Sequence, residues 1–213
     1  SGSVGPAGAI WVQGGEIDMQ DGAVIENVVG RAIYADGGTA TINGTISNIK
    51  SDGDMWNGYQ GVAIHLRNCA TASVGGTIQN VKSTDNNSVI IRGENSSFTL
   101  EQGATIQNCE GTGERGYGGL IYMNLQKVSS QELIPSFTLN GTITECASGG
   151  TVIYTVNSSA PVLIGENAKI TNNKGQRLFY ENAAANFEAQ MVIGGTITNN
   201  ICFCFTAVIM VDL

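Results

Sequence analysis

The stretch Gly194-Gly195-Thr196-Ile197-Thr198-Asn199 carries one copy of a signal that recurs seven times along this chain. Each copy centres on an isoleucine, and six of the seven have an asparagine two residues later. Alternate side chains of an extended strand point to opposite faces, so the signal predicts a strand with its isoleucine buried and its neighbours in water. The central residues are separated by 21, 32, 28, 37, 27 and 27 positions, and they are Ile25, Ile46, Ile78, Ile106, Ile143, Ile170 and Ile197.

Two further apolar stretches accompany each copy. One precedes the signal, as in Phe98-Thr99-Leu100 and Phe137-Thr138-Leu139, and ends four or six residues before the central isoleucine. The other lies between successive signals, as in Leu120-Ile121-Tyr122, and Val208-Ile209-Met210 would be its eighth copy. Three short strands in each repeat predict an all-β fold, a right-handed parallel β-helix (β-solenoid) of about seven coils with three short strands per coil.

Loops of unequal length separate the expected coils. The long segments are residues 50–61, 111–119 and 124–136, and we expect all of them to leave the same corner. Left-handed hexapeptide solenoids have rigid six-residue turns that would not accommodate such variation, and right-handed crossovers are the rule in parallel sheets. We expect residues 1–213 to form a single β-helix domain. Because residues 201–213 are almost wholly apolar, we also expect the chain to be a segment of a longer protein.

Composition excludes several classes of partner. The formal net charge is −8, and the sequence has no run of basic residues. Nucleic acids and anionic membranes bind clusters of Lys and Arg, so we expect no nucleic-acid partner. No stretch has the length and apolarity of a transmembrane helix, so we expect no direct membrane insertion.

The spacing of the cysteines suits small core residues and neither a disulfide framework nor a zinc site, so we expect no metal and no cofactor. These cysteines are Cys69, Cys109, Cys146, Cys202 and Cys204.

The asparagine after each central isoleucine is expected at a turn. Asparagine side chains stacked at a β-helix turn can hydrogen-bond to one another along the stack, so the repeat predicts a structural ladder. Glu145 occupies the equivalent position in the fifth copy and should interrupt the ladder. The predicted members are Asn27, Asn48, Asn80, Asn108, Asn172 and Asn199.

The motifs Gly75-Gly76-Thr77-Ile78 and Gly194-Gly195-Thr196-Ile197, with their trailing asparagines, and Gly118-Gly119-Leu120-Ile121 resemble those of right-handed β-helix adhesins. Over nearly its whole length the chain is similar to the polymorphic outer-membrane protein repeats and to repetitive surface proteins of gut anaerobes. The resemblance implies an extracellular or cell-surface bacterial protein that acts as a stalk or an adhesive module. The shared motifs set the geometry of the coils and carry no catalytic residue, so they specify no ligand.

Large planar side chains recur one residue after the inward apolar residue of the third strand. We expect them to project from one outer face, with Ile91 at this position in the remaining coil. Sugars stack on such faces, so we predict binding of glycans or host surface proteins there. The alternative is that these side chains stack on one another or lie beneath the long loops. The members are Trp11, Tyr34, His65, Tyr122, Tyr154 and Tyr180.

A polysaccharide-active enzyme resembling pectate lyases is the alternative function, because many pectin-active enzymes have this fold. Such a site needs paired carboxylates, or calcium-binding acids beside a basic residue. The best local set is Asp52 and Asp54, followed one strand later by His65 and Arg67. The expected strands carry no recurring column of Asp or Glu, which disfavours this alternative and favours a non-catalytic module.

A self-assembling structural solenoid is the third hypothesis. The end of a β-helix exposes unpaired strand edges, which are templates for further pairing. We expect the apolar C-terminal coil either to continue into a further segment or to associate end to end with another chain.

Overall fold

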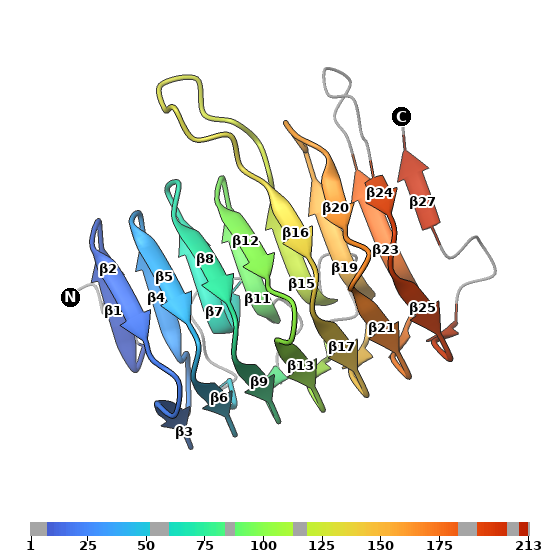
Figure 1. Ribbon diagram of the computed structural model, residues 1–213, viewed down its shortest axis with the longest axis horizontal. Coiled ribbons are helices and arrows are strands. Elements are labelled where there is room, and N and C mark those ends of the chain that lie inside the picture. Colours follow the sequence, from blue (N-terminus) through green and yellow to red (C-terminus); the bar gives the residue numbers. More distant parts are fainter. Residues whose placement is uncertain are drawn as a thin grey trace, which may run out of the picture.

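The computed structural model describes residues 8–51, 60–83, 88–112, 119–182, 191–203 and 209–212, and within these ranges the chain forms strands and turns without a helix. The strands pair in parallel and stack as a β-solenoid (Figure 1). In Figure 1 the chain rises through the more distant sheet, descends through the nearer one and returns below them as it advances from left to right, which is a right-handed path. The predicted fold class is therefore confirmed.

Three long sheets form the sides of the solenoid. Sheet A contains β1 (Ile10–Gln13), β4 (Ile33–Asp36), β7 (Gln60–Arg67), β11 (Ser88–Glu94), β15 (Gly119–Asn124), β19 (Thr151–Val156), β23 (Arg177–Asn182) and β27 (Ile209–Asp212). Sheet B contains β2 (Glu16–Met19), β5 (Thr39–Ile42), β8 (Thr71–Val74), β12 (Ser97–Leu100), β16 (Phe137–Leu139), β20 (Val162–Ile164) and β24 (Met191–Ile193). Sheet C contains β3 (Val24–Glu26), β6 (Thr45–Ser47), β9 (Thr77–Gln79), β13 (Thr105–Gln107), β17 (Thr142–Thr144), β21 (Lys169–Thr171) and β25 (Thr196–Thr198).

A fourth, short sheet was not expected from the sequence. Sheet D follows sheet C in the third to seventh coils and contains β10 (Lys82–Ser83), β14 (Glu110–Gly111), β18 (Ala147–Ser148), β22 (Lys174–Gly175) and β26 (Ile201–Cys202). The seven strands of sheet C confirm seven coils. The eighth strand of sheet A, β27, pairs Ile209 with Phe179 and so confirms the expected eighth copy within the described residues.

The core is one continuous column of apolar side chains. The central isoleucines pair in register from Ile25 to Ile197, and the five between them are fully buried. Sheet B contributes Phe98 and Phe137, whose rings stack with centroids 6.0 Å apart. Each coil covers the apolar face of the next, so no coil is a separate folding unit.

The long segments leave two corners, and the expectation of a single corner is wrong. Residues 50–61 and 111–119 lead from the sheet C side to sheet A, whereas residues 124–136 connect β15 of sheet A to β16 of sheet B. Backbone hydrogen bonds join the described residues of neighbouring coils on both sides, as from the Asn95 N–H to the Asn124 carbonyl at 2.8 Å and from the Ser51 N–H to the Lys82 carbonyl at 3.0 Å. The stack therefore keeps its register where the length of the connection varies from coil to coil.

Backbone conformation explains the recurring asparagine at the turn after sheet C. All six predicted ladder residues have φ between 53° and 59°, the left-handed region that asparagine tolerates better than other side chains. Within the described part of the chain, their side chains make no hydrogen bonds to one another. The ladder there is made by the backbone: the Asn108 N–H donates to the Thr144 carbonyl at 3.3 Å, and the Glu145 N–H donates to the Thr171 carbonyl at 3.3 Å. Glu145 therefore does not interrupt it.

A side-chain asparagine ladder lies one residue further along, inside the core. The Nδ2 of Asn173 donates to the Ile143 carbonyl at 2.9 Å, while its Oδ1 accepts the Cys146 N–H at 3.0 Å. The Oδ1 of Asn200 accepts bonds from the Asn173 amide groups at 2.9 and 3.0 Å. In the preceding coils this inward position holds the buried free thiols of Cys146 and Cys109, which confirms both as core residues. The doublets Asn172-Asn173 and Asn199-Asn200 are the sequence signal for this ladder.

We predict that Glu145→Asn stabilises the protein. Glu145 has a φ of 55°, and this conformation costs a side chain other than Gly or Asn about 1–2 kcal/mol. Asparagine should recover part of that strain and raise the free energy of unfolding by about 0.5–1 kcal/mol in urea titrations. The reverse exchange at the equivalent position, Asn108→Glu, should lower it by a similar amount. If neither substitution changed the free energy of unfolding, the strain argument would be contradicted.

Candidate functional site

The structure aligns the predicted aromatic residues in one column on the outer side of sheet A. Tyr34 pairs with Trp11 and His65, and Tyr154 pairs with Tyr122 and Tyr180. The placement of all six residues in one column is therefore confirmed.

For the remaining coil, the predicted member of the column is wrong by one position. Arg92, and not Ile91, lies in register between His65 and Tyr122. Ile91 pairs with the inward Ile64 and is buried in the core. The register of β11 against β7 shifts between Val89 and Ile91, and this irregularity moves the arginine into the column.

The column is not the exposed platform that the sequence predicted. Tyr34, His65 and Tyr154 are 4% exposed and Tyr122 is 8% exposed, whereas Trp11 is 54% exposed and Tyr180 is partly buried. Tyr34 meets His65 edge to face at 5.2 Å, and Tyr154 stacks on Tyr180 at 4.9 Å. Neighbouring coils are about 4.8 Å apart, so rings in this column pack against one another and do not lie flat towards solvent.

Arginine side chains complete the packing of this face. The guanidinium carbons of Arg31, Arg92 and Arg177 lie 4.8, 4.4 and 5.1 Å from the ring centroids of Tyr34, Tyr122 and Tyr180. Glu94 accepts a hydrogen bond from the Nε of Arg92 at 2.9 Å and forms an ion pair with the Nε of Arg67 at 3.2 Å. The contacts of Arg92 with Tyr122 and of Arg67 with Glu94 join neighbouring coils, whereas the others lie within one coil.

Of the residues considered for catalysis, the structure describes His65 and Arg67. His65 is buried beside the arginines, and neither ring nitrogen has a hydrogen-bond partner among the described residues. Burial lowers the pKa of His65 well below its usual value, and the charges of Arg31, Arg92 and Arg67 lower it further. Asp52 and Asp54 lie outside the described residues. No group of three or more His, Cys, Asp or Glu residues that could hold a metal ion occurs in the described ranges.

One carboxylate lies inside the solenoid. Glu181 faces inward from β23, in register with Thr155, whose hydroxyl donates a hydrogen bond to it. Burial raises the pKa of Glu181 above its ordinary value of 4.5. Among the described residues Glu181 has no cationic partner.

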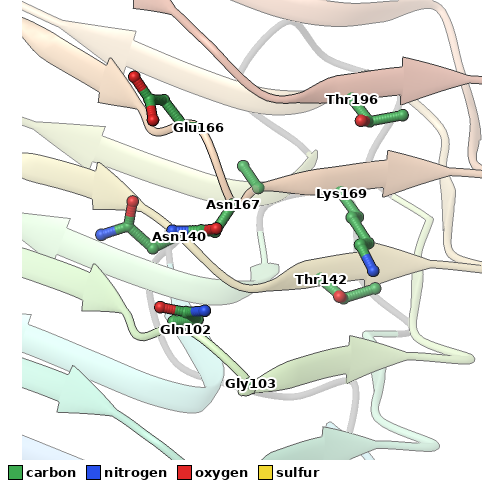
Figure 2. Close-up of a pocket in the computed structure, with 9 residues that line it drawn as sticks. Gln102, Gly103, Asn140, Thr142, Glu166, Asn167, Lys169 and Thr196 are labelled. Atoms are coloured by element: carbon green, nitrogen blue, oxygen red, sulfur yellow. The ribbon is translucent and has the colours of Figure 1, made fainter.

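A solvent-accessible groove lies at the corner between sheets B and C. Its volume is ≈ 330 Å³, and the turns of three successive coils and the first residues of three sheet C strands, β17, β21 and β25, line it (Figure 2). The lining residues are Gln102, Gly103, Asn140, Thr142, Glu166, Asn167, Ala168, Lys169 and Thr196. We did not predict this groove from the sequence.

The groove arises from the two lengths of the turn between sheets B and C. The turn after β16 is of the short form, and it lies between the long turns after β12 and β20. The long turns protrude and form two walls, and the short turn leaves a notch between them. Gly103 has a φ of 91° in one wall, a conformation that glycine adopts without strain. The alternation of four- and six-residue spacings was the sequence signal for this groove.

Side chains provide much of the hydrogen-bonding capacity of the groove, because several backbone N–H groups of its lining already have partners. The backbone N–H groups of Asn140, Thr142 and Lys169 donate to carbonyls of the preceding coil at 2.8, 2.9 and 3.0 Å. The walls and floor therefore present carboxamides, hydroxyls, one carboxylate and one ammonium group. In Figure 2 the side chain of Lys169 extends toward Thr142 along the floor.

No helix in the described residues is long and apolar enough to cross a membrane. Comparison with protein-family models, curated proteins and solved structures gave no match for this chain.

The pH dependence of stability should reveal the buried His65. Its lowered pKa means that its contribution to stability is present above the unfolded-state pKa of about 6.5 and is lost as the pH falls. Between pH 6.5 and 5.5 the free energy of unfolding of the wild type should fall relative to His65→Gln, by at most about 1.4 kcal/mol per pH unit. Tyr154→Phe has no titrating change in this range and should parallel the wild type. If the free energy of unfolding of His65→Gln also changed with pH in parallel with that of the wild type, the pKa of His65 would not be lowered by folding.

Glu181 should produce the opposite dependence. A carboxyl with a raised pKa stabilises the fold below its unfolded-state pKa and loses that contribution as the pH rises through its folded-state value. The melting temperature of Glu181→Gln should therefore rise relative to the wild type between pH 4.5 and neutral pH. Thermal melts across this range measure the difference, with the exposed Glu166→Gln as control. If the difference in melting temperature between Glu181→Gln and the wild type did not change with pH, a raised pKa of Glu181 would be contradicted.

Proposed function

We propose that the chain is a non-catalytic module of an extracellular or cell-surface protein, a rigid spacer that also presents an adhesive surface to glycans or host surface proteins. The observation that carries this proposal is the unbroken core. The central isoleucines stay in register through seven coils, so no break in the stack provides a hinge. Six intervals of about 4.8 Å give a rod section of about 29 Å.

The outer face of sheet A supports the same function. Its aromatic and arginine side chains contact one another between coils, in the manner of Tyr122 with Tyr154 and Arg92 with Tyr122. Contacts that join neighbouring coils resist bending of the rod. In this proposal the aromatic column stiffens the spacer, and adhesion belongs to another surface.

Small-angle X-ray scattering of the purified chain tests the spacer. We expect a rod-like particle whose maximum dimension does not change with temperature below the melting transition. Phe137→Ala should cost about 3–5 kcal/mol by opening a cavity in a central coil, and should increase hydrogen exchange there. Thr138→Ala, on the outward side of the same strand, is the control and should leave both measurements unchanged. Scattering from a flexible, bent wild-type chain would overturn the proposal, and lengthening with concentration would indicate end-to-end assembly instead.

A further inference from the structure

We infer that the groove between sheets B and C binds one or two units of a neutral, hydroxyl-rich glycan. This inference rests on the proposed adhesive function and places adhesion at a surface different from the aromatic column. The groove is open to solvent and is made entirely of described residues (Figure 2).

The groove is small. The two long turns that flank it belong to the fourth and sixth coils, which are separated by two coil spacings, about 9.6 Å. The lining also includes Thr196 of the seventh coil, so the groove extends beyond the turn of the sixth coil. Its volume of ≈ 330 Å³ lies at the lower end of the range for ligand pockets, about 300–1,000 Å³. This space suits a short ligand unit lying between the walls.

The lining groups match hydroxyls better than other ligand chemistries. Gln102 and Asn167 stand on opposite walls and Asn140 lies on the floor, and each carboxamide both donates and accepts hydrogen bonds. The hydroxyls of Thr142 and Thr196 have the same dual capacity. A sugar ring presents hydroxyls that also donate and accept, in several directions at once.

Peptide and metal ligands fit the groove less well. A peptide that adds a strand needs free backbone donors, but those of Asn140 and Thr142 already bond to the preceding coil. A divalent cation prefers several oxygen ligands with negative charge, and Glu166 is the single carboxylate in the lining. The ammonium of Lys169 would also repel a cation.

Charge favours a neutral glycan over an acidic one. Glu166 and Lys169 give the lining no net charge, and neither forms an ion pair with another described residue. The whole chain carries a net charge of −8, which disfavours a polyanionic ligand. Both charged side chains remain able to hydrogen-bond to sugar hydroxyls.

The repeat provides a closely matched control. Thr45 and Thr142 occupy the same register position in the second and fifth coils, but only Thr142 lines the groove. Thr142→Trp should fill the groove, whereas Thr45→Trp places the same ring outside it. Both side chains are partly exposed, so both variants should fold, as unchanged thermal melts would verify.

The experiment is an NMR titration of the isotopically labelled chain with cellohexaose, mannohexaose and hexagalacturonate at millimolar concentrations. We expect a neutral hexasaccharide to shift the amide resonances of the turns after β12, β16 and β20. Thr142→Trp and the double variant Gln102→Ala/Asn167→Ala should weaken binding about ten-fold or more, whereas Thr45→Trp should leave it within about two-fold.

Three results would overturn the inference: no shifts with either neutral hexasaccharide, equal binding by wild type and Thr142→Trp, or binding of hexagalacturonate alone. The spacer is tested separately by scattering. A rigid chain that binds no sugar overturns only the inference, whereas a sugar-binding chain that bends freely overturns only the rigid spacer.

Discussion

The whole structure depends on in-register hydrogen bonding between coils at the spacing of one β-strand. Apart from the irregularity in β11, paired residues of a sheet lie in register with their counterparts in the previous coil, as Ile106 lies between Ile78 and Ile143. A residue type repeated at one position therefore becomes a continuous column. Columns of apolar residues form the core. Where the side chains of a column do not fit the distance between coils, they must pack differently or shift out of the column.

The two asparagine positions illustrate how strongly direction matters within such a stack. Asn172 and Asn173 are adjacent in sequence, but they have different structural roles. Asn172 has a φ of 59° and turns the chain at the surface, whereas Asn173 lies inside and satisfies backbone groups of neighbouring coils. Because a buried backbone donor or acceptor without a partner is costly, the inner asparagines stabilise a turn that apolar side chains or thiols occupy in earlier coils.

The aromatic column on sheet A and the groove between sheets B and C also differ because of the spacing between coils. Rings stacked at one coil spacing bury each other, so the column from Tyr34 to Tyr180 contributes cohesion between coils. A groove requires the opposite condition, a coil that is locally shorter than both neighbours. The short turn at Asn140 meets this condition between the long turns at Gln102 and Glu166. Variation between repeats, and not their regularity, creates the recognition surface that we propose.

The sequence by itself determined the parallel β-helix, the seven coils, the inward isoleucines and the common column of the aromatic residues. These features follow from alternation and spacing, which are local properties of a strand repeat. Only the tertiary structure decided that Tyr34 and Tyr154 are buried, that Arg92 replaces Ile91 in the column, and that the turns form a groove at Thr142. Burial, register irregularities and concavity depend on contacts between coils about 20 to 40 residues apart along the chain. A pattern within one coil cannot specify them, because they arise from differences between neighbouring coils.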